Sequence, residues 1–139
     1  MTTISPENSQ SYTILLIDDF QSSADLVRLI LSRRYNDSTI IIATSGTEGI
    51  KTAQKSSPDL IILRIMLMSG NNGYEVCSQL KTISHLKQVP VLLLGAKQPQ
   101  EVYQQAKFCN ATGYLYQPFH PEQLYKACEA LLSGKTYFP

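Results

Sequence analysis

The apolar run Leu60–Leu63 constrains the fold of this chain more than any other stretch. A continuous run of this length between turn signals is typical of a strand buried on both faces, as in a parallel sheet. The run follows Pro58-Asp59 and ends at a charged residue, Arg64, before a loop that closes with Asn71–Gly73. Because ligands of open α/β sheets bind at the carboxyl ends of strands, Arg64 stands where a functional group is expected.

Similar short apolar segments recur along the chain and alternate with segments that have the spacing of amphipathic helices. Strands are predicted at residues 12–17, 39–43, 60–64, 91–94 and 113–117, and helices at 20–35, 45–56, 73–85, 98–109 and 121–133. The connections are short, so the strands must run parallel with right-handed crossovers. The sequence therefore predicts an α/β fold, a doubly wound five-stranded parallel sheet with five helices.

The 139 residues have the length of one domain, and residues 12–133 hold all the predicted elements. The polar segment 1–11 contains Pro6 and is predicted to be a disordered N-terminal tail. Residues 134–139 include Tyr137 and Phe138 and are predicted to form an exposed C-terminal tail.

Composition argues against several classes of protein. Twelve basic and 11 acidic residues give a net charge of +1, which does not support a nucleic-acid partner. No apolar run approaches the roughly 20 residues that span a bilayer, and no signal-peptide pattern is present, so we expect no membrane partner and a cytoplasmic location. Cys77, Cys109 and Cys128 lack Cys-x-x-Cys spacing and are expected to be small buried residues in a reducing compartment.

Polar or small residues stand where the predicted strands end, and these ends converge on one edge of a parallel sheet. The residues are Asp18, Asp19, Arg64, Gly95 and Gln117. Two adjacent carboxylates at such an edge suit a hard cation such as magnesium. The alternative is that Asp18 caps the helix beginning near Phe20 and Asp19 faces solvent.

Five segments, in this order and spacing, resemble the receiver domain of bacterial response regulators. They are Ile14–Asp19, Pro58–Leu63, Asn72–Val76, Val89–Leu94 and Ala111–Phe119. The resemblance covers about residues 12–132. It implies a flavodoxin-like receiver topology with strand order 2-1-3-4-5.

In that family, the acidic pair and an aspartate that ends strand three bind magnesium, and this aspartate takes a phosphoryl group from a histidine kinase. A Thr or Ser that ends strand four and a Lys before the proline after strand five contact the phosphoryl oxygens. At these three positions the present chain has Arg64, Gly95 and Gln117, and only Asp18 and Asp19 match.

Arg64 has no nucleophilic oxygen and stays protonated, so it cannot form an acyl phosphate. Its charge changes that of the pocket from −3 to −1, and a magnesium ion about 4 Å away would be repelled by roughly 8 kcal/mol at an effective dielectric constant near 20. We therefore expect no bound metal and hypothesise a bidentate salt bridge from Arg64 to Asp18 or Asp19 in place of the cation. The alternative is that Arg64 points into solvent.

The loop after Arg64 also departs from the family pattern. Met68 stands in place of a proline, and Gly73 lies one position later than the family's glycine. We expect this loop to be reshaped.

Tyr114 occupies an aromatic position that turns inward in receivers when the strand-four hydroxyl moves toward phosphate. Gly95 has no hydroxyl, so this coupling should be absent, and Tyr114 is expected to be a half-buried packing residue. Tyr103, Tyr116 and Tyr125 are expected near the family's partner face, which comprises helix 98–109, strand 113–117 and helix 121–133. A homodimer through this face is a further expectation.

These features predict a pseudo-receiver of a bacterial two-component phosphorelay, which acts by contact with a histidine kinase, another regulator or an output protein. The chain lacks a glycine-rich phosphate loop and a Gly-x-Ser-x-Gly elbow, so we expect neither enzyme activity nor a cofactor. Two alternatives stay open. One is a receiver still phosphorylated on Asp18 or Asp19 with magnesium, and the other is a domain that binds a small anion between Arg64 and Gln117.

Overall fold

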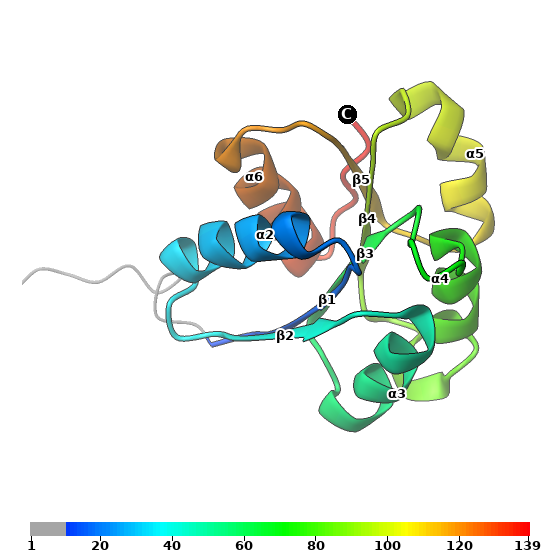
Figure 1. The fold of residues 1–139 in the computed structure, drawn as a ribbon, viewed down its shortest axis with the longest axis horizontal. Coiled ribbons are helices and arrows are strands. Elements are labelled where there is room, and N and C mark those ends of the chain that lie inside the picture. The colour runs from blue at the N-terminus through cyan, green and yellow to red at the C-terminus, as the bar shows by residue number, and fades with distance from the viewer. Residues whose placement is uncertain (1–10) are drawn as a thin grey trace, which may run out of the picture.

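Five parallel strands form one sheet, in the order β2-β1-β3-β4-β5, in a computed structural model that describes residues 11–139 (Figure 1). The strands are β1 Thr13–Ile17, β2 Thr39–Ala43, β3 Leu60–Arg64, β4 Val91–Gly95 and β5 Gly113–Tyr116. β3 lies between β1 and β4, and each residue of its apolar run is at most 1% exposed. The predicted strands, their order and their ends to within one residue are confirmed.

Five α-helices within the described residues cover the two faces of the sheet. They are α2 Gln21–Arg34, α3 Gly46–Ser56, α4 Gly73–Lys81, α5 Pro99–Phe108 and α6 Pro121–Leu132. Figure 1 shows α2 and α6 on one face and α3, α4 and α5 on the other, and each group packs over its own apolar core. The fold is the flavodoxin-like, doubly wound fold expected from the sequence. None of these helices is long and apolar enough to cross a membrane.

Local sequence signals set the helix ends. Ser45 is the N-cap of α3, where its hydroxyl accepts a hydrogen bond from the amide of Glu48 at 3.0 Å. The Glu48 carboxylate reaches back to the amide of Thr44 at 2.7 Å, one residue beyond the usual capping-box partner. Asn110 follows α5 with a left-handed backbone (φ 64°), as expected for the residue that closes this helix.

The prediction of one helix from residue 73 to 85 is wrong at its C-terminal end. α4 ends at Lys81, and Ile83 is extended (φ −88°, ψ 121°) before a 3-10 turn at Ser84–Leu86. Ile83 packs against the core, and Leu86 is only 1% exposed. The apolar stripe that suggested a longer helix is therefore buried by a change of backbone direction.

The strand register aligns the residues at the carboxyl ends of the strands. Ile17 pairs with Leu63, Arg64 with Leu94, and Gly95 with Tyr116. The residues that end β3 and β4, and those that follow β1 and β5, consequently meet along one edge of the sheet.

Tails were predicted at residues 1–11 and 134–139. The first lies outside the described residues except for Ser11, whose hydroxyl donates to the carbonyl oxygen of Asp37 at 2.8 Å. Gly134, Lys135, Thr136 and Pro139 are exposed, as expected of a C-terminal tail, but Tyr137 and Phe138 are half-buried. Tyr137 lies parallel to Gly113, and its amide donates to the carbonyl oxygen of Thr112 at 3.0 Å. Its own carbonyl oxygen accepts a hydrogen bond from the amide of Tyr114 at 2.8 Å.

The next residue of this C-terminal segment (Lys135–Pro139) packs against α5. Phe138 meets the ring of Tyr103 edge-on, with ring centroids 5.4 Å apart. The Tyr103 hydroxyl donates a hydrogen bond to the carbonyl oxygen of Pro139. The segment thus covers β5, an edge strand whose backbone groups would otherwise face solvent.

Replacing Phe138 with alanine should lower the free energy of unfolding by about 1–2 kcal/mol, because a half-buried ring leaves Tyr103. A chain ending at Gly134 should lose more, since the backbone hydrogen bonds of Tyr137 disappear as well. Thr136→Ala, at an exposed position, is the control and should change stability by less than about 0.5 kcal/mol. Urea unfolding measures these differences, and an unchanged Phe138→Ala midpoint would contradict the packing.

Candidate functional site

The residues predicted to share a pocket lie at the carboxyl edge of the sheet. Asp18 and Asp19 follow β1, Arg64 ends β3, Gly95 ends β4, and Gln117 follows β5. Nη1 of Arg64 lies 3.9 Å from Oδ2 of Asp18 and 3.5 Å from Oε1 of Gln117. The structure therefore brings three of the five side chains together, whereas Asp19 and Gly95 contact other groups.

Asp18 is a buried carboxylate with only 1% of its surface exposed. Its Oδ1 accepts a hydrogen bond from the amide of Phe20 at 2.9 Å and caps the turn that leads into α2. Its Oδ2 has no hydrogen-bond partner among the described residues and faces Arg64 beyond hydrogen-bonding distance. Burial raises the pKa of Asp18, against the lowering effects of the Phe20 amide, the Ser23 hydroxyl and the Arg64 charge.

Asp19 holds the loop that follows β3. Its Oδ1 accepts a hydrogen bond from the amide of Met68 at 2.9 Å, and its Oδ2 accepts one from the amide of Ser69 at 2.7 Å. Although desolvation acts in the opposite direction, these amides hold the pKa of Asp19 below its ordinary value. A proline at position 68 would have no amide proton. Met68, which stands in place of the proline expected from the family pattern, therefore supplies one of these two hydrogen bonds. In the alternative considered for this pair, Asp19 faces solvent; it is partly exposed, and both of its oxygens accept hydrogen bonds from the loop.

The same loop closes tightly against the end of β3. Met66 and Asn72 form an antiparallel bridge, and the amide of Gly73 donates to the carbonyl oxygen of Ile65 at 2.7 Å. A Cβ atom at Gly73 would lie 2.5 Å from the carbonyl oxygen of Arg64. Glycine is required at position 73 because a side chain has no room there. The loop residues between β3 and α4 lie before this close contact.

The Arg64 side chain contacts polar and aromatic groups of the loop after β3 and of the start of α2. Its Nε donates to the carbonyl oxygen of Met66 at 3.3 Å, and its Nη1 donates to Oγ of Ser23 at 3.3 Å. The guanidinium carbon lies 5.4 Å from the centroid of the Phe20 ring, within the range of a cation–π contact. The side chain is 25% exposed, so the alternative in which it points freely into solvent is wrong.

The expected salt bridge between Arg64 and Asp18 is present, but the expected bidentate geometry is wrong. A single guanidinium nitrogen faces Asp18 at 3.9 Å, and both oxygens of Asp19 are bound to loop amides. Arg64 instead shares its donors among a backbone carbonyl, a hydroxyl and an amide oxygen. Its charge compensates Asp18 through space rather than through paired hydrogen bonds.

A cavity of about 490 Å³ opens beside this guanidinium. Ser23, Phe20 and Phe119 line it together with Arg64 and Gln117. Sequence reasoning missed Ser23 and Phe20 as contacts of Arg64. Ser22 and Ser23 are adjacent in the first turn of α2, and only the three-dimensional placement of α2 distinguishes the one that reaches β3.

The donor set at this edge fits a divalent cation poorly. Both oxygens of Asp19 are engaged by amides, and the free oxygen of Asp18 has a guanidinium 3.9 Å away. A cation placed between them would have to displace these donors and lie next to a like charge. No group of three His, Cys, Asp or Glu side chains within residues 11–139 is arranged to hold a metal ion.

Tyr114 fills the space beside Gly95. Its side chain is fully buried, and its hydroxyl donates to the carbonyl oxygen of Lys97 at 2.6 Å. A Cβ atom at Gly95 would lie 3.2 Å from the Tyr114 hydroxyl oxygen and 3.3 Å from its Cε1. The expectation of a half-buried ring is therefore wrong, and the missing side chain at position 95 is what makes room for full burial.

The other three tyrosines do not share one face. Tyr103 and Tyr116 pack on the side of the sheet covered by α3, α4 and α5. Tyr125 packs on the opposite side, where its hydroxyl donates to the carbonyl oxygen of Ile30 at 3.0 Å and its ring lies 5.3 Å from the guanidinium carbon of Arg34. Tyr125 thus contacts α2, and its place near the candidate partner face stays a prediction.

The strand order, the acidic pair after β1 and the pocket at the carboxyl edge define a receiver-type α/β signalling domain. The chain belongs to the response regulator receiver domain family, whose sequence profile matches residues 14–129. Receiver domains of two-component systems interact with histidine kinases and other regulators.

Known proteins resemble this chain in sequence and structure. It is 34% identical over 119 residues to the alkaline phosphatase synthesis transcriptional regulatory protein PhoP of Bacillus subtilis, covering 86% of this chain and 48% of PhoP. It is 27% identical over 121 residues to protein PilH of Pseudomonas aeruginosa, covering 87% of this chain and 98% of PilH. The structure of chemotaxis protein CheY4 of Vibrio cholerae superposes with a TM-score of 0.81 at 30% identity, covering 88% of this chain and 99% of CheY4. The chain spans about half the length of PhoP.

Replacing Asp18 with asparagine should raise the free energy of unfolding by about 1 kcal/mol at pH 7, because a buried charge disappears while an acceptor for the Phe20 amide stays. The folded-state pKa of Asp18 is raised, so the wild-type chain loses stability as the pH rises through that pKa. The difference between variant and wild type should therefore vanish below the ordinary aspartate pKa of 3.8. Urea unfolding over a pH series measures it.

Two substitutions control this experiment. Asp25→Asn changes an exposed aspartate on α2 and should leave the stability at pH 7 nearly unchanged. Arg64→Gln removes the compensating charge and should act in the opposite direction from Asp18→Asn. A loss of stability in Asp18→Asn at pH 7 would contradict the view that the Asp18 charge is only partly compensated.

A methyl group at position 95 would lie 3.2 Å from the Tyr114 hydroxyl oxygen and from Cδ1 of Ile65, so these side chains would have to shift by a few tenths of an ångström. We expect Gly95→Ala to cost about 1–3 kcal/mol of unfolding free energy, and the cost should fall when Tyr114 is replaced with alanine in the same chain. Ala96→Ser, at the exposed next position, is the control. Additive effects of Gly95→Ala and Tyr114→Ala in a double-mutant cycle would overturn the proposed packing of Tyr114 against Gly95.

Proposed function

We propose that this chain is a pseudo-receiver, a receiver domain that accepts no phosphoryl group and signals by contact with another protein. The observation that carries the proposal is Arg64 at the end of β3, with Nη1 3.9 Å from Asp18 and 3.5 Å from Gln117. In the family, this position holds the aspartate that takes the phosphoryl group. A guanidinium has no nucleophilic oxygen and stays protonated at physiological pH.

The surroundings of Arg64 support the same proposal. An acyl phosphate on Asp18 would have to form on a carboxylate that is buried and capped by the Phe20 amide. One on Asp19 would release the amides of Met68 and Ser69. Phosphoryl transfer depends on positive groups placed around the transferring oxygens, and Arg64 is the charged donor of this pocket but stands in the place of the nucleophile.

The packing of Tyr114 supports a signalling face with one conformation. The ring is buried beside Gly95, which has no hydroxyl to move in response to a phosphoryl group. The face formed by α5, β5 and the C-terminal segment would then be constant. Signalling would depend on the presence and concentration of the partner rather than on modification of the pocket.

The partner is proposed to be a protein, namely a histidine kinase, another regulator, an output protein or a second copy of this chain. Tyr103 and Tyr116 lie on the proposed face, and Tyr103 is already covered by Phe138 and Pro139. A partner at this face would contact the C-terminal segment or displace it. Aromatic side chains of this kind bury a large area at little cost in side-chain entropy.

One observation favours a second candidate, binding of a small anion. The cavity of about 490 Å³ beside Arg64 has a guanidinium, a hydroxyl from Ser23 and an amide from Gln117 on its walls. These groups could hold a carboxylate or a phosphate ester, with the rings of Phe20 and Phe119 beside it.

Incubation with acetyl phosphate and magnesium tests the main proposal, with a phosphorylatable receiver domain treated in parallel. The wild-type chain is expected to show no mass increase corresponding to a phosphoryl group, and beryllofluoride should not change its tyrosine fluorescence. Arg64→Asp restores a third carboxylate and is expected to gain magnesium binding, measured by titration calorimetry.

A covalent phosphoryl adduct on Asp18 or Asp19 of the wild-type chain, located by peptide mass spectrometry, would overturn the pseudo-receiver. Thermal stabilisation by acetyl phosphate without an adduct, absent in Arg64→Gln, would favour the anion-binding candidate.

A further inference from the structure

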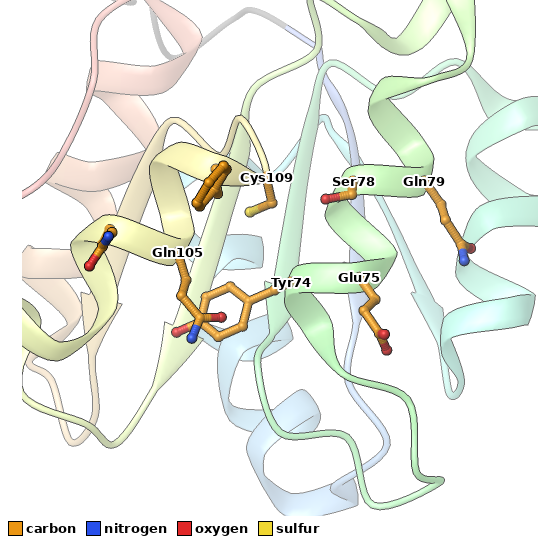
Figure 2. Close-up of a pocket in the computed structure, with 8 residues that line it drawn as sticks. Tyr74, Glu75, Ser78, Gln79, Gln105 and Cys109 are labelled. Atoms are coloured by element: carbon orange, nitrogen blue, oxygen red, sulfur yellow. The ribbon is translucent and has the colours of Figure 1, made fainter.

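A groove of about 660 Å³ separates α4 from α5, on the face of the sheet away from α2. Figure 2 shows Tyr74 of α4 and Gln105 of α5 reaching toward each other across it, with Cys109 between the two helices at its end. Phe108 stands at the rim and is 83% exposed. The Cys109 side chain is 2% exposed and lines this groove. Cys109 is therefore the cysteine of this chain that borders the groove.

A second cysteine faces Cys109 from the other helix. Cys77 of α4 is fully buried, and its thiol donates to the carbonyl oxygen of Cys109 at 3.2 Å. Cys109 is the C-cap residue of α5, where its thiol additionally contacts the carbonyl oxygen of Ala106 at 3.4 Å. The two cysteines, 32 residues apart in sequence, are thus in direct contact.

The surroundings of the pair make the two sulfur atoms unequal. The neighbouring Cys77 thiol lowers the pKa of Cys109, against the opposing effect of burial. The neighbouring Cys109 thiol and burial both raise the pKa of Cys77. Lys81 lies near both thiols, and its charge favours a thiolate. Cys109 is therefore the better nucleophile, and Cys77 stays a thiol next to it.

Cys128 provides an internal comparison. It lies on the opposite face of the sheet in the core beneath α2 and α6, and it is fully buried. Burial raises the pKa of Cys128 to about 12. A fully buried thiol with a raised pKa is inert toward oxidants and alkylating agents while the protein is folded.

We propose that Cys77 and Cys109 form a redox-active dithiol, which hydroperoxides convert to an intramolecular disulfide joining α4 to the end of α5. This modification site is independent of the pocket at Arg64, and it holds whether or not that pocket accepts a phosphoryl group. The spacing of these cysteines is not that of a Cys-x-x-Cys motif, so the sequence alone predicts only small buried residues.

The reaction balances with hydrogen peroxide as the oxidant. The Cys109 thiolate attacks one peroxide oxygen, the O–O bond breaks, and the departing hydroxide takes a proton and leaves as water. The sulfur atom of Cys77 then attacks the sulfenic acid on Cys109, the S–O bond breaks, and the hydroxyl leaves as water with the Cys77 proton. Two thiols are oxidised by two electrons, and one peroxide is reduced to two waters.

The disulfide would connect the groove to the proposed partner face. α5 carries both Cys109 at its end and Tyr103, which contacts Phe138 of the C-terminal segment. A covalent link from Cys109 to α4 would fix the position of the helix that holds this segment. Oxidation would therefore alter how tightly the C-terminal segment is held.

The test treats the whole reduced chain with hydrogen peroxide, unfolds it, alkylates the remaining thiols and measures the mass. We expect the loss of two hydrogen atoms, one alkylated thiol at Cys128, and a linked Cys77–Cys109 peptide pair that dithiothreitol releases. Three alkylated cysteines after peroxide treatment would overturn the proposal. A disulfide that includes Cys128, or oxidation of Cys109 to sulfinic acid without any disulfide, would overturn it as well.

Single variants assign the roles of the two sulfur atoms. Cys77→Ala should accumulate a sulfenic acid on Cys109 that dimedone captures, because the second thiol is missing. Cys109→Ala should form neither the disulfide nor the dimedone adduct. Cys128→Ala is the matched control and should form the Cys77–Cys109 disulfide at the wild-type rate. Dimedone capture at Cys77 in the Cys109→Ala chain would reverse the assignment. The wild-type experiment stands on its own if a variant folds poorly.

Discussion

Burial of β3 on both faces is the constraint on which the rest of the structure depends. Its four apolar side chains each contribute about 1.5–3 kcal/mol when they leave water, and this holds the strand between β1 and β4. Because β3 is held in this way, the position of its last residue is fixed as well. Arg64 consequently stands at the carboxyl edge of the sheet beside Asp18, and the neighbouring groups have to satisfy a guanidinium there.

Two adjustments around Arg64 belong together physically. The loop after β3 uses the amides of Met68 and Ser69 to hold Asp19, so Asp18 is the carboxylate that faces the guanidinium. On the next strand, the absence of a side chain at Gly95 lets the Tyr114 ring reach the carbonyl oxygen of Lys97. Both adjustments occupy space or hydrogen-bonding capacity next to Arg64. They favour a domain with one resting conformation.

Two further features lie at α5, namely the C-terminal segment and the contact between Cys77 and Cys109. The C-terminal segment lies along β5 and packs Phe138 on Tyr103, so it protects the edge strand as an added strand would. The contact between Cys77 and Cys109 lies at the other end of α5. A protein–protein function at this face could thus be regulated through α5 without phosphate chemistry. The proposed disulfide and the proposed partner face meet in that one helix.

The sequence by itself determined the fold, because apolar runs of strand length alternating with helical stripes leave few ways to bury every apolar face. It also located the pocket, since the residues that end the strands of a parallel sheet must converge. The contacts within that pocket depended on distances that spacing does not encode. Arg64 donates hydrogen bonds to Met66, Ser23 and Gln117, and its salt bridge with Asp18 is not bidentate.

Only the tertiary structure decided the remaining features. The helical phase of α6 turned Tyr125 toward α2, and the turn at Ile83 ended α4 early. Some contacts join segments that are distant in sequence, and no local pattern predicts them. Examples are the bridge between Gly113 and Tyr137 and the hydrogen bond between Cys77 and Cys109. Local patterns report which face of an element is buried, whereas the identity of the neighbour depends on how whole elements pack against one another.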